Sequence, residues 1–299
     1  MYLAITLTVA AGPAAAAAPA SGLRVLTSIF PLKEFASAIV GDRGDVELLL
    51  PPGAGVHTWQ PRPGDLVRLA EADLFIIVGA GLEPWLPDLM KGLTDRRPRM
   101  LEVSTGLALL PAADEEPGHH DHGRFDPHIW LDPEIDVGIV ASIRDKLTSL
   151  DPEGGPTFRR NASALEGRLR DLDAAYRQGL RGCAGKTLVL AGHAAFGYLT
   201  RRYGLEQVAL YGASPDAQPR PADLIGIVDK ARALGVRAVF AEGSESPALA
   251  RSLARELGLP MMTLYPVHNL TRAEIRAGKT FFDVMEANLR SLEDGLGCR

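Results

Sequence analysis

Short apolar runs alternate with amphipathic segments along most of the chain, and this alternation is the main guide to its fold. Runs that are typical of strands occupy residues 23–28, 46–50 and 74–78 in the first half, and residues 187–190, 208–210, 238–240 and 261–264 in the second. Between them, helical patterns predict helices at 63–71, 221–234 and 247–257, and a Thr271/Glu274 capping box predicts a last helix at 271–296. Strands that alternate with helices favour mostly parallel sheets, so we expect an α/β fold with two lobes.

A different pattern occupies residues 155–181, between the two sets of strands. The apolar residues that recur there at helical spacing are Phe158, Leu165, Leu169, Leu172, Tyr176 and Leu180. They predict one long amphipathic helix of roughly 40 Å, at 1.5 Å per residue, which would act as a rigid connector. The predicted organisation is therefore an N-terminal lobe at 22–154, a linker helix at 155–181 and a C-terminal lobe at 182–299.

The first twenty residues carry no charged side chain and end in Ala18-Pro19-Ala20, a pattern typical of a secretory signal peptide. We therefore expect residues 1–20 to direct export, although the absence of Lys and Arg from them leaves the true translation start open. In an exported protein Cys183 and Cys298 form either one disulfide or two free thiols. The net charge of −5 gives little electrostatic support for nucleic-acid binding.

Three of the seven histidines stand where strands or loops are expected to reach a ligand site. His57 follows the 46–50 strand through a Pro-Pro-Gly-Ala-Gly turn, and His193 follows the 187–190 strand by three residues. Ligands of open α/β sheets bind beyond the carboxyl ends of the strands, so these two side chains can meet in the interlobe cleft. His128 lies in a loop and adds a third imidazole, and three such nitrogens suit zinc.

Two aspartates flank His128 in the stretch from Phe125 to Pro133. Asp126 and Asp132 can each accept a hydrogen bond that orients the imidazole, or each can cap a turn or helix beside the proline that follows it. Capping is the favoured role for Asp132, because a helical pattern begins directly after it.

Another group of histidines forms a short acidic loop six residues before His128, with His119, His120 and His122 around Asp121. Tethered imidazoles among acidic side chains attract cations, so we expect the loop to recruit metal or to hold a second, weaker ion. We also expect it to be a disordered polar loop and a possible contact for a metallochaperone.

Three motifs resemble those of the periplasmic zinc- and manganese-binding proteins of ATP-binding-cassette importers, and the resemblance covers essentially the whole mature chain. The matching stretches are PPGAGVH at 51–57 with PRPGD at 61–65, DPHIWLDP at 126–133, and HAAFGY at 193–198 with RYGL at 202–205. The resemblance implies two α/β lobes joined by one long helix, with a metal held in the cleft by His57, His128 and His193. Since the third ligand is a histidine rather than a carboxylate, zinc is favoured over manganese.

The fourth ligand is where the sequence departs from that family pattern. Relatives commonly carry an acidic ligand in a loop near the start of the last helix, but the corresponding stretch at 264–270 has no carboxylate. His268 lies in that loop and is our first choice, while Glu242 and a water molecule are the alternatives. A capping or solvated role for His268 stays open. Zinc-specific relatives also carry a histidine-rich insertion before the second ligand, as this chain does at 119–122.

These features predict a monomeric, non-enzymatic protein of the periplasm that captures Zn(II) and hands it to the membrane permease of an ATP-binding-cassette importer. Its zinc affinity should fall as the pH drops through about 6.5, and its lobes should move little because the connector is stiff. The alternatives are a manganese-binding importer component, a zinc-dependent hydrolase with Glu242 as base, and an adhesin or storage protein on the same fold. The absence of a His-Glu-x-x-His motif disfavours the hydrolase.

Overall fold

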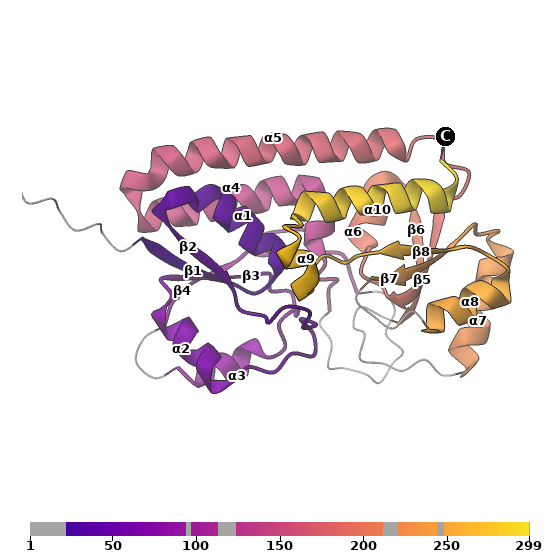
Figure 1. Cartoon of the computed structure of the whole chain (residues 1–299), viewed down its shortest axis with the longest axis horizontal. Coiled ribbons are helices and arrows are strands. Elements are labelled where there is room, and N and C mark those ends of the chain that lie inside the picture. The colour runs from indigo at the N-terminus through magenta and orange to yellow at the C-terminus, as the bar shows by residue number, and fades with distance from the viewer. Residues whose placement is uncertain (1–21, 94–96, 113–123, 212–220, 244–247, 299) are drawn as a thin grey trace, which may run out of the picture.

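The computed structural model describes residues 22–93, 97–112, 124–211, 221–243 and 248–298, and these residues form two four-stranded sheets. The first sheet has the order β2-β1-β3-β4, with β1 (Leu23–Thr27), β2 (Gly44–Leu48), β3 (Leu74–Ile77) and β4 (Arg99–Glu102). The second has the order β6-β5-β7-β8, with β5 (Thr187–His193), β6 (Glu206–Tyr211), β7 (Val239–Glu242) and β8 (Met261–Leu264). Neighbouring strands pair in parallel in both sheets, which confirms the predicted α/β fold with two lobes (Figure 1).

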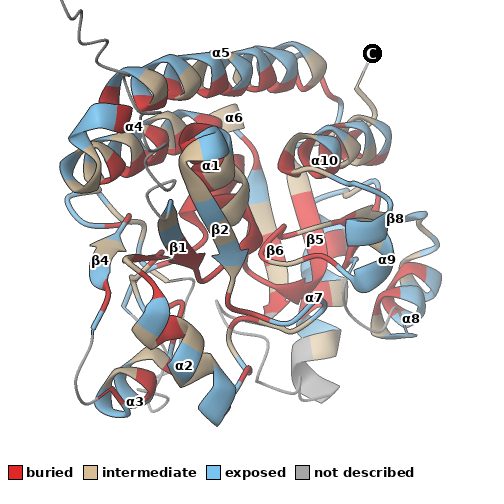
Figure 2. Cartoon of the chain, turned by 60° about the vertical axis from the view of Figure 1, so that its left-hand side comes forward, coloured by how far each residue is buried: buried red, intermediate tan, exposed pale blue. Residues whose placement is uncertain are grey.

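Helices flank both sheets (Figure 1). In the first half of the chain they are α1 (Phe30–Val40), α2 (Pro63–Glu71), α3 (Leu86–Lys91) and α4 (Pro133–Leu150). In the second half they are α6 (Gly197–Tyr203), α7 (Pro221–Ala233), α8 (Ala248–Leu257), α9 (Arg272–Arg276) and α10 (Phe281–Leu296). Prolines begin α2 and α4, where the missing N–H breaks no helical hydrogen bond. Buried residues gather on the strands and on the inner sides of the helices (Figure 2).

The long helix α5 (Gly155–Gly179) runs across the top of both lobes (Figure 1). Its 25 residues correspond to about 37 Å at the usual helical rise. Its buried face consists of Gly155, Phe158, Ala162, Leu165, Leu169, Leu172 and Tyr176. Near one end the Asn161 amide donates a hydrogen bond to the carbonyl of Ile39 in α1, and near the other the Tyr176 hydroxyl donates to the carbonyl of Met285 in α10. The helix predicted at 155–181 is thus present and contacts both halves of the chain.

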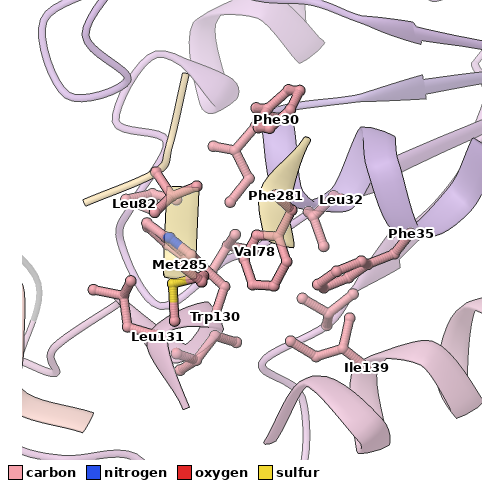
Figure 3. Close-up of a cluster of buried hydrophobic side chains, with 14 of the residues drawn as sticks. Phe30, Leu32, Phe35, Val78, Leu82, Trp130, Leu131, Ile139, Phe281 and Met285 are labelled. Carbon is pink, nitrogen blue, oxygen red and sulfur yellow. The ribbon is translucent and has the colours of Figure 1, made fainter. Parts of the chain in front are cut away.

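A shared hydrophobic core joins the lobes, and Figure 3 shows the part of it around Phe35, Trp130 and Phe281. Phe35 of α1 packs edge-on against Phe281 of α10, with ring centroids 5.0 Å apart. The fully buried indole of Trp130 donates a hydrogen bond of 2.7 Å to the carbonyl of Pro266, which follows β8 in the second lobe. A wide opening of the lobes would expose this apolar surface, which is unfavourable. The core therefore supports the expectation of small lobe movements.

The segment after β8 corrects one prediction, because α9 and α10 are two helices rather than one at 271–296. The expected capping box of Thr271 and Glu274 begins α9. A second capping box, made by Thr280 and Asp283, begins α10, and Gly278 between them has a φ of +69°, which ends the first helix. The continuous helical pattern of the sequence concealed this break.

Cys183 and Cys298 form a disulfide across a sequence separation of 115, so the chain adopts the first of the two expected alternatives. The bond ties the segment after α5 to the end of α10. The expected signal peptide at 1–20 and the histidine loop at 119–122 lie outside the described residues. Among the described ranges no helix is both long and apolar enough to cross a membrane. The lobe boundaries and the monomeric state stay predictions.

Candidate metal centre

Three histidines converge where the carboxyl ends of the two sheets meet. His57 lies in the loop between β2 and α2, His128 directly precedes the short helix Ile129–Leu131, and His193 is the last residue of β5. The position of His193 corrects the expectation that it follows the strand by three residues, because β5 continues beyond Leu190 to His193 through a shift in register. One ligand nitrogen of each histidine lies within 4.8 Å of the other two. The structure therefore brings together the three residues that the sequence analysis favoured as ligands.

The spacing of the imidazoles fits a metal ion. Nε2 of His128 and Nε2 of His193 lie 3.2 Å apart. Zinc–nitrogen bonds of about 2.0–2.1 Å place neighbouring donors of a tetrahedral site about 3.3 Å apart, close to this separation. The centroids of the three rings are 5.0, 5.5 and 5.6 Å apart, so the rings of His57, His128 and His193 form one compact cluster.

Two buried carboxylates orient the two closest rings. Oδ1 of Asp126 accepts a hydrogen bond of 2.9 Å from the main-chain N–H of His128 and lies 2.8 Å from Nδ1 of its ring. Oε1 of Glu242, at the end of β7, lies 2.6 Å from both the main-chain nitrogen and Nδ1 of His193. A proton on each Nδ1 leaves both Nε2 lone pairs facing the cluster, and this is the form in which imidazole binds a metal. Two such lone pairs 3.2 Å apart repel each other unless a cation lies between them.

Burial lowers the pKa of two imidazoles in the region of the cluster, those of His128 and His268. Desolvation, together with the proximity of His193, lowers the pKa of His128 well below its usual value of 6.5. The same causes lower the pKa of His268 to about 4. Burial alone would raise the pKa of Glu242, but hydrogen bonds and the interaction with His193 outweigh it and lower that pKa. The neutral imidazoles of His128 and His268 and the ionised carboxylate of Glu242 favour a bound cation.

His268 lies close to the cluster but is not part of the compact group of three. It belongs to the loop between β8 and α9 and is buried, and its Nδ1 has no hydrogen-bond partner among the residues that the structure describes. Oε1 of Glu242, the alternative donor, is already held by His193. The role of His268 as fourth ligand stays a prediction, as does a water molecule in its place.

Asp132 caps α4, which confirms the role favoured for it. Its carboxylate accepts a hydrogen bond of 3.0 Å from the main-chain N–H of Glu134. The same carboxylate lies 3.2 Å from the guanidinium of Arg202 in α6, and Arg202 also pairs with Asp173 of α5 at 2.6 Å. The first ion pair ties the second lobe to the segment that carries His128, and the second ties it to α5.

Tryptophans hold the loop that carries His57. The indole N–H of Trp85 donates a hydrogen bond of 2.9 Å to the carbonyl of Val56, the residue before His57. Trp59 packs against Trp85 in a T-shaped arrangement, with centroids 4.8 Å apart. Their contact with the ligand loop joins positions that lie far apart in the chain, so no local pattern indicates it.

Comparison with known proteins agrees with this geometry. Residues 25–295 match the family described as ZnuA, zinc-uptake complex component A, periplasmic. The chain belongs to this family. It is 32% identical over 281 residues to the high-affinity zinc uptake system protein ZnuA of Bacillus subtilis, which covers 92% of this chain and 88% of that protein.

A second relative is longer than this chain. The zinc-binding lipoprotein AdcA of Streptococcus pneumoniae is 36% identical over 277 residues, covering 91% of this chain but 55% of AdcA. The chain therefore spans about half the length of this curated relative. The crystal structure of the Zn(II)-bound ZnuA-like domain of that AdcA superposes with a TM-score of 0.78 at 34% identity, covering 92% of this chain and 99% of the domain.

Proposed function

We propose that this chain is an extracytoplasmic binding protein that captures Zn(II) and delivers it to the permease of an ATP-binding-cassette importer. The observation that carries the proposal is the pair of Nε2 atoms of His128 and His193, 3.2 Å apart, each on a ring whose Nδ1 is held by a buried carboxylate. His57 supplies the third nitrogen, and His268 is the proposed fourth ligand. Membership of a family described as a periplasmic component of a zinc-uptake complex supports both the location and the need for a membrane partner.

The donor set favours zinc over manganese. His57, His128 and His193 each offer a ring nitrogen, whereas carboxylate and water oxygens suit manganese. The two nearby carboxylates, Asp126 and Glu242, face the Nδ1 atoms of the ligand rings, so their closest oxygens serve the histidines. A manganese-binding importer component remains the runner-up.

The same arrangement argues for a carrier rather than a hydrolase. A zinc hydrolase needs an open coordination position and a base that can take a proton from water. Glu242 is the base that the sequence nominates, and its Oε1 is held at 2.6 Å by the ring and the main chain of His193. An oxygen held in this way orients the imidazole of His193 as a metal ligand. A binding protein requires that orientation, whereas a hydrolase requires a base that is free to reach water.

Capture and release then depend on small loop movements and need no proton to leave His128 first. His128 is buried and neutral, so it binds zinc without first losing a proton. The shared core limits wide lobe opening, so we propose that ions enter and leave through movement of the ligand loops rather than through a hinge.

Competitive titration of the purified protein with zinc and manganese tests this function. We expect zinc to bind more tightly than manganese, and we expect the His193→Ala variant to lose most of its zinc affinity. Equal or tighter binding of manganese would overturn the choice of metal. Unchanged zinc affinity in the variant would remove His193 from the site.

A further inference from the structure

The tip of the loop that carries His57 is exposed to solvent. Pro51 and Gly53 are exposed, and the tip contains a local hydrogen bond from the Ala54 main-chain N–H to the Pro51 carbonyl. Beyond the tip the loop enters the core, where Val56 is fully buried and its carbonyl accepts the hydrogen bond from Trp85. An exposed tip with little buried surface samples several conformations, so the path of the chain into Val56 and His57 depends on what fixes this tip.

A segment of the other lobe contacts the tip directly. The side-chain amide of Asn269, in the loop between β8 and α9, donates hydrogen bonds to the carbonyls of Pro51 at 2.8 Å and Ala54 at 2.9 Å. The amide oxygen of Asn269 accepts from the main-chain N–H of Leu270 at 2.8 Å. The carbonyl of Leu270 in turn accepts from the main-chain N–H of Gly53 at 2.9 Å. Asparagine suits this position because one short side chain supplies two donors and one acceptor.

The backbone around Asn269 is itself firmly held. Val267 is a buried β-branched residue with a φ of +62°, a conformation that persists only where the surroundings impose it. The surroundings here come from the first lobe and the segment before α4. The carbonyl of His268 accepts from the main-chain N–H of Phe30 at 2.9 Å, and the carbonyl of Pro266 accepts from Trp130. Asn269 therefore belongs to a firmly held segment, and its side chain donates hydrogen bonds to the exposed tip of the His57 loop.

We propose that Asn269 is a positioning residue that holds His57 in the zinc site from the opposite lobe. The proposal rests on the zinc-binding function proposed above. Without the two donors, His57 would occupy its ligand position for only part of the time, and the apparent dissociation constant rises in inverse proportion to that fraction. The loss of two hydrogen bonds to exposed carbonyls predicts zinc affinity that is roughly tenfold weaker, with faster release of the ion.

The test measures zinc affinity by chelator competition and zinc release by stopped flow, on the full chain and its Asn269→Ala variant. The matched control is Asn161→Ala, which removes another asparagine that donates to a main-chain carbonyl, far from the metal centre. We expect Asn269→Ala to weaken zinc binding and speed release, while Asn161→Ala changes neither. If Asn269→Ala binds and releases zinc like the wild type, or if both variants weaken binding equally, the proposal is wrong.

A double-mutant cycle identifies the ligand through which Asn269 acts. The effect of Asn269→Ala should vanish in a His57→Ala background and persist in a His268→Ala background. An effect that vanishes only with His268 would overturn the assignment to His57. Failure of the proposed function itself has a different signature, because the wild type would then bind no zinc and His57→Ala would change nothing.

Discussion

Replacement of Glu242 by glutamine tests whether the Glu242 carboxylate strengthens His193 as a metal ligand. Oε1 of Glu242 lies 2.6 Å from both the main-chain nitrogen and the ring Nδ1 of His193. Glutamine keeps the size of the side chain and an oxygen that can accept either bond, so the variant removes chiefly the negative charge. That charge makes the imidazole a stronger donor to the metal through its Nε2.

The expected loss of zinc affinity follows from this geometry. Partners that orient a metal-binding histidine typically contribute about 10–100-fold to affinity. This range corresponds to about 1.4–2.7 kcal/mol of binding free energy. The fold lowers the pKa of Glu242, so the ionised carboxylate stabilises the metal-free protein, and the melting temperature of metal-free Glu242→Gln should fall at neutral pH.

Competition with a zinc-selective chelator measures the dissociation constants of the wild type and Glu242→Gln. The control variant Glu256→Gln changes an exposed glutamate of α8 that pairs with Arg232, and it should bind zinc like the wild type. If Glu242→Gln binds zinc within twofold of the wild type, the carboxylate does not tune His193 and the reasoning fails.

Three other properties can be checked in the same preparations. Burial holds the pKa of Asp136 well above its usual value, and its carboxylate has no hydrogen-bond partner among the described residues. A carboxyl group whose pKa is raised by folding destabilises the fold as the pH rises. Asp136→Asn should therefore raise the melting temperature at pH 7.5, and raise it less at pH 4. The exposed control Asp145→Asn should show no such difference. The pKa of His268 is lowered from 6.5 to about 4, so protonation of this histidine opposes folding as the pH falls from 6.5 to 4. Calorimetry should show that the metal-free wild type loses more unfolding free energy than His268→Asn over this pH range. Reduction of the Cys183–Cys298 disulfide should lower the unfolding free energy by about 2–5 kcal/mol in denaturant titrations, with zinc affinity unchanged.

The sequence is informative about this molecule wherever the pattern is local. Alternating strands and helices predict both lobes, and the spacing of Phe158, Leu165 and Leu169 predicts α5. His57 and His193 are recognisable because each is close to the carboxyl end of a predicted strand, and the carboxyl ends of parallel strands gather ligands. Strand β4 was missed because its sequence, Arg-Met-Leu-Glu, is short and half charged, as suits an edge strand.

Contacts between distant residues were beyond prediction. Glu242 could be nominated as a ligand or a base, but only the pairing of β5 with β7 brings its carboxylate to His193. Asn269 lies 215 positions from Ala54, and no periodicity indicates that their loops meet. The contact between Asp126 and His128 was easier to predict, because the two residues lie only two positions apart in the sequence.

Zinc K-edge X-ray absorption of the zinc-loaded protein tests the central claim most directly, because it reports the atoms bound to the ion. The account predicts a first shell of nitrogen and oxygen at about 2.0–2.1 Å that contains at least three imidazoles, with one fewer in His193→Ala. A sulfur shell at about 2.3 Å, or a shell of oxygens without imidazole, would contradict a site built from His57, His128 and His193.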